Sequence, residues 1–247
     1  MDEAGPNRQE STQYHDVLDG TTLFQEGCIP IRAIPWVSRG LLKDHRHNFY
    51  EFVFIEQGIS THYYNNMTSL LTPGDLFGIR PYNVHSYIHS KDVVLYNCIF
   101  KHEALENEYR ELVQLPGIGN IIDIDHPTEW QRIHLDPISR KEIVTTLDQM
   151  RIEEERKADG WQLKMKSLLI SFLVSFSRAF SLRYRGESDT DYKYAEYMYK
   201  ALAYINAHFT ETILIESLSA HIGLSTDYFS RMFKQFTGLT PVEYIKN

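Results

Sequence analysis

Four side chains that could bind a metal ion or hold a polar ligand lie in the first third of the chain: His45, His47, Glu51 and His85. Alternate residues of a β-strand point to the same side of a sheet, so His45 and His47 can face one interior together. With Glu51 and His85 they would offer three imidazoles and one carboxylate, a set that zinc, nickel, manganese or iron can accept. The same groups can instead hydrogen-bond a polar small molecule, or one another, without a metal.

Three further residues close to this set in the sequence could line a pocket: Trp36, Tyr96 and Asn97. Aromatic faces, hydroxyls and amides are the groups that orient polar effectors such as sugars. Alternation along a strand sends about half of such side chains outward, so the pattern alone does not fix the lining. We treat all seven residues as candidate effector-binding residues.

A second stretch with possible chemistry lies at the C-terminal end, from Ile213 to Asn247. Gly223 suits a tight turn between two helices, and Ser219, a small residue, lies four positions earlier, where two crossing helices would touch. Ser225 can cap the second helix and Gly238 can end it. The apolar residues that would pack the two helices together are Leu218, Ile222, Leu224, Phe229 and Met232. This pattern is typical of a DNA-reading helix-turn-helix, although helical hairpins that bind nothing share the spacing.

Six residues at or near the exposed side of the second helix are candidates for DNA contact: Ser225, Thr226, Asp227, Ser230, Arg231 and Lys234. Arg231 can make a bidentate contact with guanine, and Asp227 can accept from the cytosine amino group. Lys234 suits a phosphate contact or a packing stem.

The elements that must position the first set are short, β-branched and aromatic segments between residues 29 and 100, separated by turn signals. They read IRAIPWV, YEFVFIE, STHYYN, DLFGIR, VHSYIH and VVLYNCIF. Strands this short at this spacing indicate a sandwich or a small barrel. Pro30 and Pro35 confine the first strand to an edge or a bulge, because proline cannot donate to a ladder.

Helical patterns follow the strands. Asp136 and Pro137 are a favourable helix start, and Ile143, Leu147 and Met150 form one apolar stripe. Residues 161–184 form a helix that is apolar on most of its circumference, which predicts burial on more than one side. Its second apolar face can pack in the core of a monomer or on a partner subunit. Residues 194–209 predict the first helix of a C-terminal domain.

Composition limits the class of protein. The 247 residues carry a net charge of −8, which argues against a protein that coats nucleic acid without sequence preference. The 43% of hydrophobic residues predict a globular core. Cys28 and Cys98 lack metal or redox spacing. The N-terminus has no secretory pattern, and no segment spans a bilayer comfortably, which predicts a cytoplasmic protein. From Asn206 onward the sequence contains three Lys or Arg and four Asp or Glu. Any DNA affinity of this segment must therefore be modest and come from a few local residues.

The segment SLSAHIGLSTDYFSRMFKQFTGLTPVEYIK resembles the first helix-turn-helix of the AraC/XylS family of transcription regulators. The matching residues are Leu218, Gly223, Leu224, Ser225, Tyr228, Phe229, Arg231, Phe233, Lys234, Gly238, Pro241 and Tyr244. This resemblance implies sequence-specific operator DNA, a homodimer formed through the helices after the barrel, and RNA polymerase as a further candidate partner. Family members carry a second helix-turn-helix, which this sequence does not reach.

His45 to Glu51 followed by Gly58 resembles the first cupin motif, and Pro73-Gly74-Asp75 with Pro81 and His85 resembles the second. The second motif is one residue short and has Asn83 where glycine is usual. In this form it resembles cupins fused to AraC-type domains, which implies a small effector rather than a catalytic metal. The set His45, His47, Phe49, Glu51 and Asn97 resembles the rhamnose-responsive subgroup.

We therefore predict an α+β protein with five parts. They are a flexible arm (1–20), a cupin-like effector-binding β-barrel (21–130), a helical dimerisation segment (131–184), a linker (185–193) and an incomplete all-α helix-turn-helix domain (194–247). We expect a transcription regulator and not an enzyme, sensing a small polar metabolite such as a sugar, with no cofactor and no membrane. The alternatives are a metal-dependent cupin enzyme that uses the three histidines and Glu51, and a sensor or antagonist that does not bind DNA.

Overall fold

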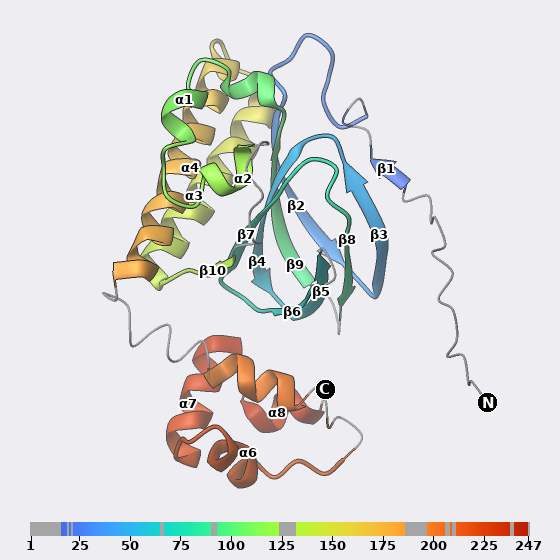
Figure 1. Ribbon diagram of the computed structural model, residues 1–247, viewed down its shortest axis with the longest axis vertical. Helices are drawn as coiled ribbons and strands as arrows, with labels where there is room; N and C mark the ends of the chain where they lie inside the picture. Colours follow the sequence, from blue (N-terminus) through green and yellow to red (C-terminus); the bar gives the residue numbers. More distant parts are fainter. Residues whose placement is uncertain are drawn as a thin grey trace, which may run out of the picture.

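The short β-rich segments form two five-stranded sheets that face each other, as expected for the predicted barrel (Figure 1). The computed structural model describes residues 16–18, 20, 22–64, 67–89, 93–123, 132–185, 197–205, 208, 211–237 and 240–246. The strands of the first sheet are, in spatial order, β1 (Asp16–Leu18), β3 (Leu41–His47), β8 (His85–His89), β5 (Ser60–Tyr64) and β6 (Met67–Leu71). Those of the second are β10 (Arg132–His134), β7 (Asp75–Ile79), β4 (Tyr50–Gln57), β9 (Val93–Phe100) and β2 (Ile31–Ser38).

The sequence predicted the edge position of strand β2 but not the presence of strand β1. β2 lies at the edge of its sheet, as Pro35 required. The predicted flexible arm is wrong for residues 16–18, because they form β1 and pair in parallel with β3, with Asp16 opposite His45. Three residues are too few to display a strand alternation, so the sequence carried no signal for this strand.

Strand β4 separates two layers of the core. Val53 and Ile55 face the first sheet and pack in the barrel interior with residues such as Leu71 and Tyr64. Phe52 and the other residues of opposite parity face the helices. The period of two along this strand therefore decides which side chains reach the barrel interior and which reach the helical layer.

Helices cover the outer face of the second sheet (Figure 1). Their bounds are η1 (His102–Leu105), α1 (Tyr109–Leu112), α2 (Gly119–Ile122), α3 (Pro137–Arg156) and α4 (Trp161–Arg185). The carboxylate of Asp136 accepts hydrogen bonds from the amides of Ile138 and Ser139 (2.8 and 3.1 Å), which confirms the predicted start of α3. Phe172 and Phe176 of α4 meet the Phe52 ring edge to face, at 5.5 and 5.1 Å between centroids, and fix α4 on the sheet.

Helix α4 is also the one stretch of the described chain with the length and apolar composition of a membrane span, over Trp161–Leu182. Of that window, 56% is buried inside the protein. Leu169, Phe172 and Leu173 are completely buried in the core beneath the sheet. The apolar character of α4 is thus accounted for in large part by packing within the chain.

The C-terminal residues form a small helical unit beneath the barrel (Figure 1). It comprises a helical segment over residues 197–205, then α6 (Ile215–His221), α7 (Thr226–Thr237) and α8 (Pro241–Lys246). Gly223 has φ +78° and makes the turn between α6 and α7, a conformation that glycine adopts at least cost. The predicted linker lies outside the described residues except for Arg185, which ends α4, and Gly238 also lies outside them.

Candidate functional site

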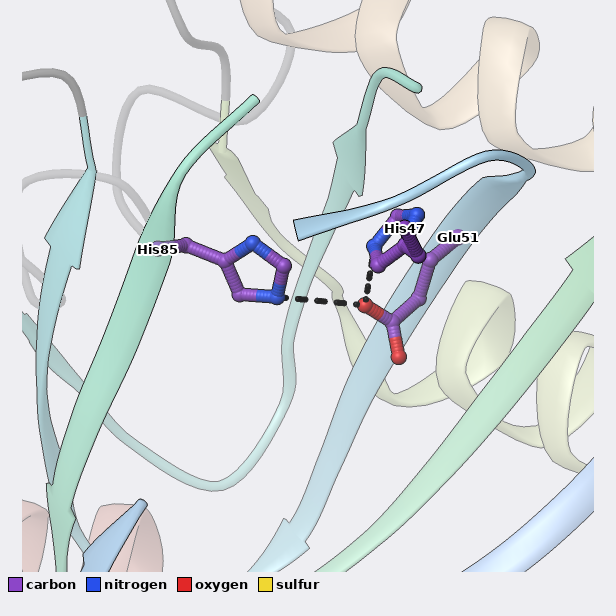
Figure 2. Close-up of side chains that lie close together, drawn as sticks. All are labelled: His47, Glu51 and His85. Carbon is purple, nitrogen blue, oxygen red and sulfur yellow. Dashed lines mark hydrogen bonds and ion pairs between the residues drawn. The ribbon is translucent and has the colours of Figure 1, made fainter. Parts of the chain in front are cut away.

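A cluster of three buried polar side chains lies inside the barrel and joins its two sheets (Figure 2). His47 comes from β3, Glu51 from β4 and His85 from β8. One carboxylate oxygen of Glu51 lies 3.1 Å from Nε2 of His47 and 3.6 Å from Nε2 of His85. All three residues are buried. We call this set the polar cluster.

His45, the fourth residue of the predicted set, lies beside the polar cluster. It is opposite His85 in the pairing of β3 with β8, and the two rings are 4.1 Å apart between centroids. Burial, followed by the neighbouring His85, lowers the pKa of His45 below its ordinary value. The structure therefore brings together all four residues that the motif spacing selected.

The backbone fixes the proton on each of the three rings. In every case Nδ1 lies against a backbone carbonyl, which can only accept a hydrogen bond, so Nδ1 carries a proton and Nε2 remains for the interior. The pairs are His45 with Lys43 (2.8 Å), His47 with Phe49 (2.7 Å) and His85 with Asn83 (3.2 Å).

Glu51 is held as a carboxylate. Burial raises its pKa, but the neighbouring imidazoles of His47 and His85 lower the pKa by more, so it lies well below the usual range of a glutamate. Because Nδ1 of His47 already carries a proton, two states satisfy its 3.1 Å contact with Glu51. These are a proton on Nε2 that is donated to the carboxylate, and a cation that lies between the nitrogen and the carboxylate.

The donor atoms of the polar cluster also fit a divalent transition metal. The ligating atoms of His47, Glu51 and His85 lie within 4.8 Å of one another. Backbone carbonyls orient both imidazoles, which is the outer-shell arrangement that metal-binding histidines use. An ion held there would be bound by Nε2 of His47 and His85 and by the Glu51 carboxylate, and would supply Lewis acidity to a bound ligand.

The other three predicted pocket residues lie in different places. Asn97 of β9 is paired with Val53, so it lies on the interior face, and its carboxamide oxygen is buried without a hydrogen-bond partner among the described residues. Trp36 is 55% exposed near the end of β2. Tyr96 has the opposite parity to Asn97 and donates its hydroxyl to Asp148 of α3 at 2.9 Å. The structure therefore does not bring Tyr96 to the polar cluster.

One residue of the interior, His62, was missed by sequence reasoning. His62 of β5 is fully buried and stacks on Tyr87 of β8, with 4.6 Å between ring centroids. Burial, then His85, lowers the pKa of His62 well below its ordinary value, so the ring is neutral at neutral pH. The alternation of Ser60, His62 and Tyr64 in one strand is the signal that could have identified His62.

The second candidate site is the outer side of α7. Among the predicted DNA-contacting residues, Ser225, Asp227, Arg231 and Lys234 are exposed and Ser230 is partly buried. Thr226 is partly buried, and its hydroxyl lies 3.1 Å from that of Ser219 in α6, so this side chain also joins the two helices.

The face of α7 opposite the exposed residues is apolar. Phe229 and Phe233 are completely buried against the neighbouring helices, together with Leu218 and Ile222. This packing leaves the Arg231 guanidinium on the surface, 5.5 Å from the centre of the Tyr228 ring. A helix with a buried aromatic face and an exposed arginine is the arrangement that a recognition helix needs.

Comparison with known families finds two matches in this chain. The family described as AraC-like ligand binding domain matches residues 39–173. The family described as bacterial regulatory helix-turn-helix proteins, AraC family, matches residues 205–246. The two matched ranges contain the polar cluster and the helix-turn-helix, respectively.

Curated relatives include the HTH-type transcriptional activator RhaS of Salmonella arizonae, which is 26% identical over 233 residues, covering 93% of this chain and 78% of the relative. RhaS of an Enterobacter species is 25% identical over 230 residues with the same coverage. Among solved structures, the chain is similar to apo ToxT from Vibrio cholerae, with 10% identity, a TM-score of 0.44 and coverage of 90% and 99% of the two chains. The two matched families, which contain both candidate sites, place this chain in the AraC family of bacterial regulatory helix-turn-helix proteins, with an AraC-like ligand binding domain.

Proposed function

We propose that this protein is a transcription activator whose barrel binds a small polyhydroxylated effector, with a sugar as the favoured class, and whose helix α7 reads an operator. One observation carries the effector proposal. Asn97 Oδ1 and His85 Nε2 are buried and have no hydrogen-bond partner among the described residues. Buried acceptors of this kind are satisfied by a ligand that brings hydroxyl groups.

The chemistry of the interior supports the same class of ligand. Glu51 and the ring nitrogens can accept hydrogen bonds from hydroxyls, while Tyr87 and His62 offer aromatic faces for the apolar side of a sugar ring. The mixture of acceptors and rings suits a neutral, hydroxyl-rich molecule better than a hydrocarbon or a strong anion.

The role of activator and the DNA-reading role rest on the family and on the relatives named above. Within α7, Arg231 would contact a guanine, Asp227 a cytosine amino group and Lys234 a phosphate. We further propose that the protein acts in the cytoplasm as a homodimer. One side of α4 is available to a partner, because Leu163, Lys164, Ser167, Ser171 and Arg178 are exposed there. RNA polymerase is a candidate partner when the protein is bound at a promoter.

Binding of sugars to the purified protein tests the effector proposal. Calorimetric titration with L-rhamnose, L-arabinose, D-galactose and D-glucose should identify a binding sugar. Asn97→Ala should weaken its binding about tenfold or more, because a buried hydrogen bond is lost. Tyr96→Phe is the matched control, since its hydroxyl binds Asp148 on the opposite side of the same strand. Binding that Asn97→Ala leaves unchanged would refute a site at the polar cluster.

A second candidate function, a metal-dependent enzyme, is favoured by the orientation of the two Nε2 atoms toward Glu51. Elemental analysis of protein purified without chelators separates the two functions. We expect much less than one metal ion per chain, because the shortened second cupin motif resembles that of effector-binding cupins. The enzyme would be favoured by one equivalent of iron, manganese, nickel or zinc and by turnover of a substrate, if His47→Ala loses both the metal and the turnover.

A further inference from the structure

The barrel and the C-terminal helices share one buried carboxylate. Asp75, the first residue of β7, is completely buried. Its Oδ2 accepts hydrogen bonds from the amide and the hydroxyl of Thr72, at 2.8 and 3.1 Å, which close the turn before β7. Its Oδ1 accepts from Nδ1 of His134 at 3.0 Å and from the hydroxyl of Tyr199 in the helical segment 197–205. One side chain thus binds partners on both sides of the domain boundary.

A positive charge accompanies this carboxylate. A guanidinium nitrogen of Arg132 lies 3.7 Å from Oδ2 of Asp75, and the guanidinium carbon lies 4.2 Å from the centre of the Tyr199 ring. Burial raises the pKa of Asp75, but Arg132, then His134 and Tyr199, lower the pKa by more. The carboxylate is therefore charged at neutral pH and strengthens the hydrogen bond from Tyr199.

The same contact reaches the DNA-reading helix. His134 stacks on Phe236 of α7, with 4.6 Å between ring centroids and 17° between planes, and Tyr199 meets the Phe236 ring edge to face at 5.8 Å. Phe236 is the second-to-last residue of α7, while Asp227 and Arg231 remain exposed. The contact therefore fixes the C-terminal end of α7 and leaves its DNA-facing residues accessible.

Strand β7 joins this contact to the polar cluster. It begins at Asp75, and its last residue, Ile79, is paired with Glu51 on β4. Gly74, just before it, has φ +98°, and a Cβ there would lie 3.0 Å from the His134 ring. Glycine is favoured at this position for two reasons. It adopts the positive φ at low cost, and it has no Cβ to keep the His134 ring away from Asp75. A five-residue strand therefore has the effector site at one end and the domain contact at the other.

We propose that Asp75 is a positioning residue that holds the helical segment 197–205 and α7 in one orientation against the barrel, so that the state of the polar cluster biases how α7 meets DNA. This inference deepens the function proposed above and depends on it for its DNA arm. Such coupling requires that a ligand at the polar cluster and DNA at α7 each bind one arrangement of the two domains more tightly than another.

Hydrogen exchange of the whole chain tests the domain contact without effector or DNA. Tyr199→Phe removes only the hydroxyl that binds Asp75, and leaves the ring that Arg132 and Phe236 contact. Amides of residues 197–205 and of the turn 72–75 should exchange about tenfold faster or more, the effect of losing one hydrogen bond to a charged group. Amides of β8 should not change, which shows that the barrel remains folded.

Tyr204→Phe is the matched control. Tyr204 lies in the same helical segment, but its ring contacts the rings of His208 and His221 within the C-terminal unit. The distances between ring centroids are 4.1 and 4.9 Å. It should leave the exchange of the turn 72–75 at the wild-type rate. Equal exchange in the two variants would overturn the proposal.

Two more variants guard against misfolding and test the pairing itself. Asp75→Asn and Tyr199→Phe should have non-additive effects on exchange, because the first removes the charge of the acceptor and the second removes the donor of the same hydrogen bond. If Asp75→Asn opens the barrel, Phe236→Leu takes its place, since it removes the stacking on His134 without touching the carboxylate. Phe236→Leu should speed exchange in residues 197–205. Additive effects, or wild-type exchange in Phe236→Leu, would contradict the proposal.

A duplex selected from a random library by the wild-type protein tests coupling. Binding of the duplex should change the exchange of β7 and the turn 72–75 in wild type, because coupling is reciprocal, and this change should be lost in Tyr199→Phe. An unchanged response in Tyr199→Phe would overturn the coupling. If no duplex is selected, the DNA-reading function fails, while the DNA-free comparison still decides whether Asp75 holds the two domains together.

Discussion

Replacing Glu51 by glutamine tests the electrostatics of the barrel interior. The substitution keeps the shape of the side chain and removes the charge from the contact with His47 at 3.1 Å. A hydrogen bond to a charged group contributes ~1.5–3 kcal/mol, against ~0.5–1.5 kcal/mol for a neutral pair. The contact with His85, at 3.6 Å, is too long to add a full hydrogen bond. We therefore expect Glu51→Gln to lower the free energy of unfolding by ~1–2 kcal/mol at pH 7.

Differential scanning calorimetry measures the consequence. For a protein of this size, ~1–2 kcal/mol corresponds to a decrease in Tm of ~2–8 °C. The pH dependence gives a second criterion. The folded-state pKa of Glu51 lies below its unfolded value of ~4.3, so its stabilising contribution is fully present above that pH. It is lost as the pH falls through the folded-state pKa, and in Glu51→Gln it should be absent at every pH.

The control for this experiment is Glu103→Gln, which removes an exposed carboxylate from η1. It should change Tm by less than about 1 °C, since isolated surface charges contribute little. The reasoning is refuted if the two variants have the same Tm at pH 7. It is also refuted if Glu51→Gln loses stability as steeply as wild type does when the pH falls below ~4.3.

Four other outcomes can be checked with single substitutions. Arg231→Ala should weaken operator binding by ~1–3 kcal/mol and lower the specificity at one base position. Lys234→Ala should weaken binding to all DNA sequences alike and reduce the slope of log affinity against log salt concentration by ~1. Fluorescence anisotropy measures both. Phe172→Ala should lower the free energy of unfolding by ~3–5 kcal/mol in urea, and a loss below ~1 kcal/mol would contradict its place in the core. Asp136→Ala should cost ~1 kcal/mol, while an unchanged urea midpoint would refute its capping role.

Local signals in the sequence predicted much of the architecture. The capping pair at Asp136 and Pro137, the turn at Gly223 and the edge position of β2 follow from hydrogen-bonding and dihedral limits that neighbouring residues set. The spacing of two within β3 likewise placed His45 and His47 on one face. The sequence was sufficient to predict these features because residues nearby in the chain determine each conformation.

The parity of strand β9 shows where such reasoning stops. Alternation required Tyr96 and Asn97 to face opposite sides, but it did not say which side is the barrel interior. The answer depends on α3, whose Asp148 binds the Tyr96 hydroxyl and lies 52 residues away. Two partners of Asp75, His134 and Tyr199, are 59 and 124 residues distant and could not be inferred from local pattern. Such contacts depend on the packing of whole elements.

The hydrogen bond between Asp75 and Tyr199 restricts how the two halves of this protein can be exchanged with those of its relatives. A chimera joined between residues 185 and 197 would take Asp75, Arg132 and His134 from one parent and Tyr199 and Phe236 from the other. A C-terminal unit without Tyr199 would leave the buried carboxylate of Asp75 short of one donor. A barrel without Asp75 would leave the Tyr199 hydroxyl without its carboxylate acceptor. We therefore expect the barrel and the C-terminal unit to be interchangeable only when these five residues are matched.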